Sequence, residues 1–209
     1  MSSSSYLYSA TVLADVTRNI ATSPSPDVSG QAATTLQNMY DQEKVDEFVS
    51  RSEDLAKSID KEEAFMIISK EIDNCEDRYL NEYITALNFI RNEKVLDWIE
   101  NNIHRTTNIG LNWGHLAASS YFSWDRASKW LTSGRPLSLV ALDAIMFCTT
   151  IGERLNQSLW MRQIQPKLID NPKPEVVAIK LQEYLQIDNA HRTKTTINKI
   201  IENLFDARQ

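Results

Sequence analysis

Apolar residues recur every three or four positions through most of the chain from Thr34 onward. This spacing places the apolar side chains of each segment on one face of an α-helix. The apolar stripes occupy residues 45–59, 64–72, 80–90, 95–103, 124–131, 177–185 and 197–205. No segment alternates apolar and polar residues in the way that predicts a strand, so the pattern predicts an all-α fold.

Residues that favour helix ends separate these stripes. Asp60, Asn92 and Ser123 are each placed to cap the following helix, because their side-chain oxygens can accept hydrogen bonds from the free amides of a first turn. Gly134 and Pro136 suit the end of one helix and the start of the next. We therefore expect antiparallel helical hairpins joined by short turns.

The pattern is different in residues 1–33. Residues 1–33 combine a short apolar patch with the segment "TSPSPDVSGQ", residues 22–31, whose serines, prolines and glycine are typical of a linker. We expect an N-terminal arm over 1–33, either docked as a short helix or disordered, and one helical domain over 34–209.

The segment "NPKPEVVAIKLQEYL", Asn171–Leu185, places proline ahead of Glu-Val and an apolar run. It resembles the Pro-Glu-Val-Arg start of the second helix in a HEAT-like repeat, although Val177 stands where the arginine is usual. The segment "RPLSLVALDAIM" aligns with it when Val140 is matched to Val177, 37 residues later. The resemblance covers residues 76–206 and implies a short HEAT-like α-solenoid; a non-repetitive bundle explains the same helices, so both stay open.

Charge is concentrated in one part of the chain. The net charge is −6, but residues 41–77 hold thirteen acidic and five basic residues, a local charge of −8. The basic residues form no dense cluster of the kind that binds phosphates, so duplex nucleic acid is not the expected partner. The acidic helices are either a solvated surface or a docking surface for a basic protein.

Cysteine content and hydropathy favour a cytoplasmic protein. Cys75 and Cys148 are the only cysteines, and they lie outside any metal-binding or redox spacing. The N-terminus lacks the positive and apolar regions of a secretory signal, and no apolar run is long enough to cross a membrane.

Local signatures of catalysis are absent from the sequence. It contains no nucleophile elbow, phosphate-binding loop, dinucleotide fingerprint or zinc-protease motif, and its three histidines are widely spaced. We therefore expect no metal or cofactor and assign no catalytic residue. Cys148 lies in an apolar run, where a thiol normally packs as a small hydrophobic group, so a triad with His115 and Asp143 is rejected.

Five residues between positions 113 and 143 are the candidate binding residues. Trp113, Tyr121 and Arg135 are expected on loops or helix ends and belong to types enriched in binding hot spots. His115 is expected in a glycine-containing loop over 104–115. Asp143 lies within an apolar helix, where its charge needs a basic partner; Arg126, Arg135 and Arg154 are the nearest in sequence.

Two functions remain open at this point. The first is a non-catalytic interaction module, such as an adaptor, scaffold or immunity-type inhibitor, with an acidic helix face and an aromatic groove near Trp113–Arg135. The alternative is a helical enzyme whose site converges on Asp143, His115 and Arg135. If Asp143 forms only an inter-helix ion pair, the enzyme alternative has no carboxylate available for catalysis.

Overall fold

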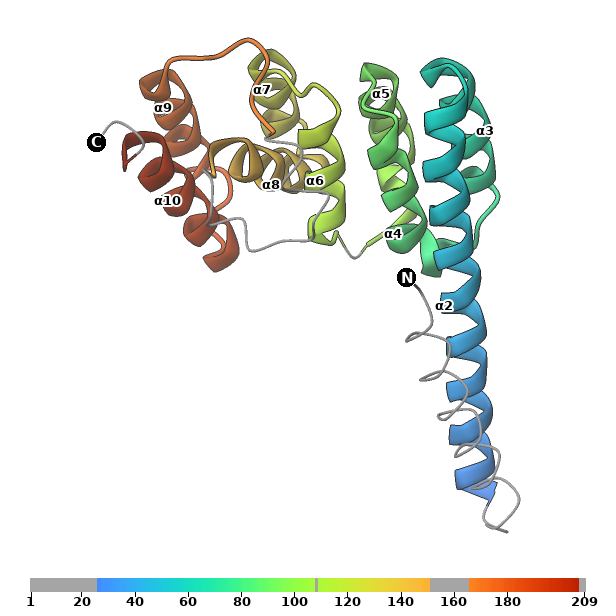
Figure 1. The fold of residues 1–209 in the computed structure, drawn as a ribbon. Helices are drawn as coiled ribbons and strands as arrows, with labels where there is room; N and C mark the ends of the chain where they lie inside the picture. Colours follow the sequence, from blue (N-terminus) through green and yellow to red (C-terminus); the bar gives the residue numbers. More distant parts are fainter. Residues whose placement is uncertain (1–25, 108, 151–165, 207–209) are drawn as a thin grey trace. The chain divides into compact units, whose positions relative to one another are not determined.

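The computed structural model describes residues 26–107, 109–150 and 166–206, with side chains from residue 37 onward. Every regular element in these ranges is an α-helix or a 3₁₀-helix, and none is a strand (Figure 1). The helices pack against one another through buried apolar side chains, so the all-α prediction is confirmed. The chain forms two compact units, residues 1–48 and 49–209; the expected boundary was between residues 33 and 34.

Helix α2 (Pro26–Ser58) begins inside the segment that we expected to be a linker. Residues 26–31 are helical, so the linker prediction is wrong for this part. Proline is compatible with the first turn of a helix, where a backbone N–H has no partner within the helix. The remaining arm, residues 1–25, lies outside the described residues. Ser52 and Ala56 of the predicted apolar stripe are buried.

Helix α3 (Lys61–Asp73) follows a short turn and begins as predicted. The Asp60 carboxylate accepts hydrogen bonds from the amides of Glu62, at 2.8 Å, and Glu63, at 3.4 Å, which confirms the predicted cap.

The next apolar stripe, over residues 80–90, forms three short elements instead of one helix. They are η1 (Asp77–Tyr79), α4 (Leu80–Tyr83) and η2 (Ile84–Phe89), whose apolar side chains at positions 80, 84 and 87 are buried.

Helix α5 (Glu93–Asn102) is capped by Asn92, whose Oδ1 accepts a hydrogen bond from the Lys94 amide at 3.0 Å, as predicted. It continues into η3 (Ile103–Arg105). Both α5 and η2 pack against α3 and α6.

Helix α6 (Leu111–Ser119) occupies much of the expected loop over 104–115. Gly114 lies inside this helix, where it permits a close contact with the neighbouring helix α8. A Cβ atom at Gly114 would lie 2.3 Å from Cβ of Asp143 and 3.0 Å from the backbone nitrogen of Ala144. This glycine therefore serves helix packing and does not break the helix.

Helices α7 (Trp124–Thr132) and α8 (Leu137–Thr149) follow. Ser123 caps α7 as predicted, because its side-chain oxygen accepts a hydrogen bond from the Arg126 amide at 3.1 Å. Gly134 lies just after the end of α7 with φ +80°, the conformation expected of a glycine at this position. Helix α8 is buried along most of its length and contacts α6, α7 and α10 (Figure 1). It is the central helix of the second unit.

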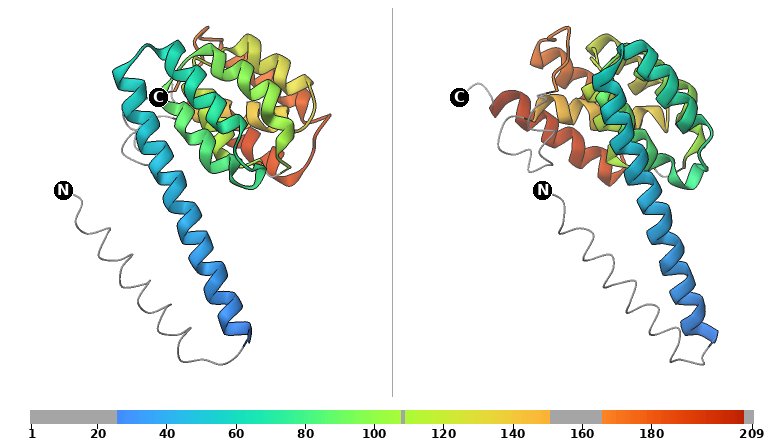
Figure 2. Two further views of the ribbon diagram at one scale, coloured as in Figure 1. Left: turned by 90° about the vertical axis from the view of Figure 1, so that its right-hand side faces the viewer. Right: turned by 45° about the vertical axis from the view of Figure 1, so that its right-hand side comes forward.

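The last helices are α9 (Pro174–Tyr184) and α10 (His191–Asp206), which lie side by side in Figure 2. Helix α9 also contacts α7, and α10 contacts α8. The segments aligned as a HEAT-like repeat lie in α8 and α9; the repeat itself stays a prediction. None of the described helices has both the length and the apolar composition that a membrane span requires.

Candidate binding surface

The five predicted binding residues do not line one groove. Trp113, His115 and Asp143 are buried, whereas Tyr121 and Arg135 are exposed. Trp113 and His115 belong to helix α6, so their assignment to a loop is wrong. Trp113 and His115 therefore have almost no exposed surface to offer to the predicted aromatic groove.

Trp113 is a packing residue of the helical core. Its ring is stacked on Trp98, with centroids 6.0 Å apart and planes at 10°. Its indole Nε1 donates a hydrogen bond to Oδ1 of Asn81 at 2.7 Å. A buried indole N–H normally needs such an acceptor. Packing against Trp98 and the bond to Asn81 therefore explain both the ring and the N–H of Trp113.

Asp143 forms an ion pair with Arg192 of α10. Nη2 of Arg192 donates to Oδ2 of Asp143 at 2.7 Å, and the Asp143 side chain is 4% exposed. Burial raises the pKa of this carboxyl, while the charge and hydrogen bond of Arg192 oppose the rise. Neither Arg126 nor Arg135 is the partner: each pairs with another carboxylate, and Arg154 lies outside the described residues.

His115 is also enclosed. Its ring meets the Phe147 ring edge to face, with centroids 5.3 Å apart, and burial lowers its pKa to about 4. Burial raises the pKa of the Cys148 thiol to about 12. At neutral pH this cysteine is a thiol, which agrees with the rejection of a nucleophilic triad.

The pKa of His115 predicts a loss of stability in mild acid. The pKa in the folded protein, about 4, lies below the ordinary value of 6.5, so the unfolded chain binds the proton first as pH falls. The contribution of His115 therefore falls by about 2 kcal/mol between pH 7 and pH 5. Urea unfolding of the wild type and of His115→Phe at both pH values measures it: the difference in unfolding free energy between the two proteins should shift by this amount. A constant difference contradicts the lowered pKa of His115. Asp143 is present in both proteins, so its contribution cancels from the difference.

Arg135 belongs to a polar cluster around Asp188, in the connection between α9 and α10. Its Nη2 and Nε donate to Oδ2 of Asp188 at 2.7 and 3.2 Å. Thr193 donates to the same oxygen at 3.0 Å, and Tyr184 donates to Ser138 at 2.9 Å. Burial alone would raise the pKa of Asp188, but hydrogen bonds from Arg135, the Ala190 amide and Thr193, together with the charge of Arg135, outweigh it and lower the pKa. Asp143 and Arg135 therefore have separate ion-pair partners.

Helix α3 exposes two large apolar side chains, which the sequence pattern did not identify. Met66 is 61% exposed and Ile67 is 45% exposed, although Ile67 was expected on the buried face. Their helical spacing groups them with Glu63 and Lys70 on the side opposite the buried Ala64, Ile68 and Ile72. We call these four residues, Glu63, Met66, Ile67 and Lys70, the α3 face.

Acidic side chains border the α3 face on both sides. Glu62 and Asp73 follow one edge and Glu71 follows the other, and all three residues are exposed. Glu62 pairs with Lys94 at 3.1 Å, and Glu71 pairs with Arg51. These ion pairs are solvent-exposed and worth little, so their carboxylates can exchange partners at small cost.

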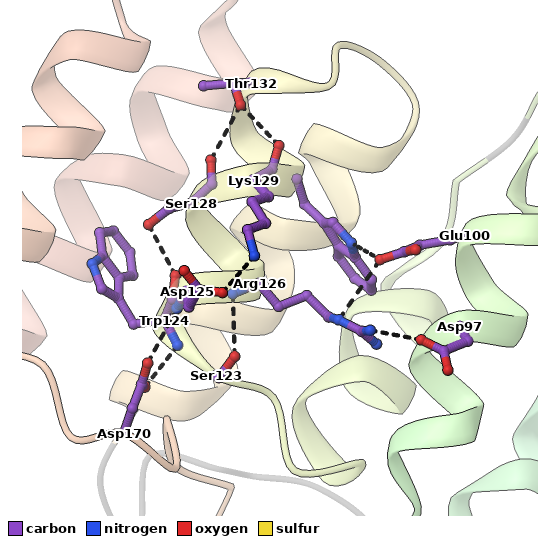
Figure 3. Close-up of polar contacts among 11 residues, drawn as sticks. Asp97, Glu100, Ser123, Trp124, Asp125, Arg126, Ser128, Lys129, Thr132 and Asp170 are labelled. Atoms are coloured by element: carbon purple, nitrogen blue, oxygen red, sulfur yellow. Dashed lines mark hydrogen bonds and ion pairs between the residues drawn. The ribbon is translucent and has the colours of Figure 1, made fainter.

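A second polar cluster surrounds the first turns of α7 (Figure 3). The Asp170 carboxylate accepts the amides of Trp124, at 2.7 Å, and Asp125, at 3.1 Å, and so adds to the Ser123 cap. Arg126 Nη2 donates to Asp97 at 2.6 Å, and its Nε lies 3.7 Å from Glu100. Asp170 is 45 residues or more from these amides in the chain, so no local pattern indicates its role.

Among the described side chains, no group of three or more His, Cys, Asp and Glu residues is arranged to hold a metal ion. No known protein family, curated protein or solved structure matches the chain.

Proposed function

We propose that this protein is a non-catalytic protein–protein interaction module that binds a basic, amphipathic segment of a partner. The observation that carries the proposal is the α3 face, where Met66 and Ile67 are exposed between acidic residues. A cytoplasmic location, expected from the sequence, is part of the same proposal, as is a protein partner in place of duplex nucleic acid or membrane.

Two properties of the α3 face support a partner of this chemistry. Exposed apolar side chains next to each other favour contact with another apolar surface, because contact removes both from water. The acidic border attracts Lys and Arg side chains and repels acidic ones, which favours basic partners and raises the rate of encounter. A helix with Leu on one side and Lys at the margins of that side matches both properties.

Binding of a defined peptide tests the proposal. The probe is a fluorescently labelled peptide of Leu and Lys arranged at helical spacing, and its control has the same composition in scrambled order. We expect the variant Met66→Ser/Ile67→Ser to bind the helical probe at least about tenfold more weakly than the wild type, because the acidic charge is retained but the apolar contact is lost. Fluorescence anisotropy measures the affinity.

A matched variant controls for the loss of exposed apolar residues in general. Val176 and Ile179 on α9 are 48% and 59% exposed, and Val176→Ser/Ile179→Ser should bind as the wild type does. Reversal of Glu62, Glu63 and Glu71 to Lys should weaken binding mainly at low salt, since salt screens exposed charges. Equal affinity of the wild type and the Met66→Ser/Ile67→Ser variant rules the proposal out.

A further inference from the structure

A cavity of about 330 Å³ lies between α5 and α7. Its lining includes Glu93, Leu96 and Glu100 from α5, Arg126 and Lys129 from α7, and Tyr121 before α7. This volume is in the range of small-ligand sites. None of the contacts assigned so far to core packing uses this space.

The basic side chains of the cavity are already neutralised. Lys129 Nζ lies 2.6 Å from Oδ2 of Asp125, and Arg126 contacts both Asp97 and Glu100 (Figure 3). The Glu93 carboxylate, by contrast, has no ion-pair partner among the described residues. The cavity lining therefore has one excess negative charge at the start of α5, which favours a cation.

Arg126 also has an unused donor. Its Nη1 is buried and makes no hydrogen bond with the described part of the chain. A buried donor without an acceptor is costly, and this atom is closed off from solvent. Arg126 therefore adds positive charge beside the cavity but offers no accessible donor through Nη1.

The other walls suit the stem of a long side chain. Leu96 is apolar, and Tyr121, which is 54% exposed with φ +60°, also lines the cavity. Aliphatic stems pack along such surfaces while the charged end reaches a carboxylate, and an aromatic ring also attracts a cation.

We propose that this cavity binds the side chain of a lysine or arginine in a peptide. The cation contacts Glu93, and the aliphatic stem packs on Leu96 and Tyr121. Lys94, which follows Glu93 in the chain, pairs with Glu62 at the border of the α3 face. The inference rests on the proposed function only for the source of the peptide, a basic partner segment.

An NMR titration tests the cavity without using the α3 face. The probe is N-acetyl-lysine methylamide, and its control is N-acetyl-norleucine methylamide, which lacks the cation. We expect saturable shifts at the backbone amides of Leu96 and Ser123 with the lysine probe only. Glu93→Gln should weaken binding at least about fivefold, and Tyr121→Asn about threefold, because asparagine tolerates the positive φ while removing the ring.

Two further variants separate this inference from the proposed function. Glu202→Gln removes an exposed carboxylate from α10 and should leave the titration unchanged. Met66→Ser/Ile67→Ser should also bind the lysine probe normally, even though it loses the helical peptide. The cavity proposal is overturned if the lysine probe gives no saturable shift, if norleucine gives the same shifts, or if Glu93→Gln binds as the wild type does. Those results leave binding at the α3 face unaffected.

Discussion

Replacement of Gly114 by alanine is expected to destabilise the second unit by more than about 3 kcal/mol. The added Cβ would lie 2.3 Å from Cβ of Asp143 and 3.0 Å from the α8 backbone. Both distances are shorter than a van der Waals contact, so the atoms would clash. Backbone cannot rotate away as a flexible side chain does, so α6 and α8 must separate. Urea unfolding followed by circular dichroism measures the change.

Gly110 supplies the matched control for this substitution. It precedes the same helix, and a Cβ built there meets nothing within 4 Å. Gly110→Ala should change the unfolding free energy by less than about 1 kcal/mol, since it adds no steric conflict. A small effect at both glycines would contradict the close packing of α6 on α8.

Replacement of Arg192 by methionine is expected to cost about 3–4 kcal/mol at neutral pH. The variant leaves the Asp143 carboxylate buried without its cation, which is more costly than the absence of the whole pair. Addition of Asp143→Asn should therefore recover about half of the loss in the double variant. Lys180→Met, which breaks the exposed pair with Glu183, should cost less than about 0.5 kcal/mol.

The pH dependence of Arg192→Met gives this prediction a second test. Burial raises the pKa of Asp143 in the folded protein above its unfolded value, and loss of Arg192 raises it further. As pH falls through this window, the folded protein takes up the proton first, so the stability deficit of the variant shrinks. A deficit that is constant or grows in acid contradicts a buried carboxylate. Comparison with the Arg192→Met/Asp143→Asn variant removes the contribution of His115.

Helix boundaries set by local chemistry could be predicted from the sequence. Asp60, Asn92 and Ser123 cap the helices that follow them, because a cap and its amides are only two or three residues apart. Gly114 was expected in a loop over 104–115, but it lies inside α6. Its role depends on α8, which comes much later in the chain, so only the packed structure reveals it.

The candidate site was predicted only in part for the same reason. The acidic character of residues 41–77 is a property of the sequence, but the exposure of Met66 and Ile67 depends on which side of α3 faces its neighbours. Arg192 is 49 residues from Asp143, and no spacing rule connects them. Asp188 offers a weak signal, since its carboxylate accepts the amide of Ala190 just before α10.

The location of peptide binding tests the central claim, that the α3 face is the recognition surface. Hydrogen–deuterium exchange of the full chain, with and without the helical Leu/Lys peptide, reports it segment by segment. We predict slower exchange over α3, residues 61–73, and no change over α9, residues 174–184, since contact stabilises the bound helix against local opening. Protection of α9 instead, or bound peptide with unchanged exchange in α3, would contradict the account.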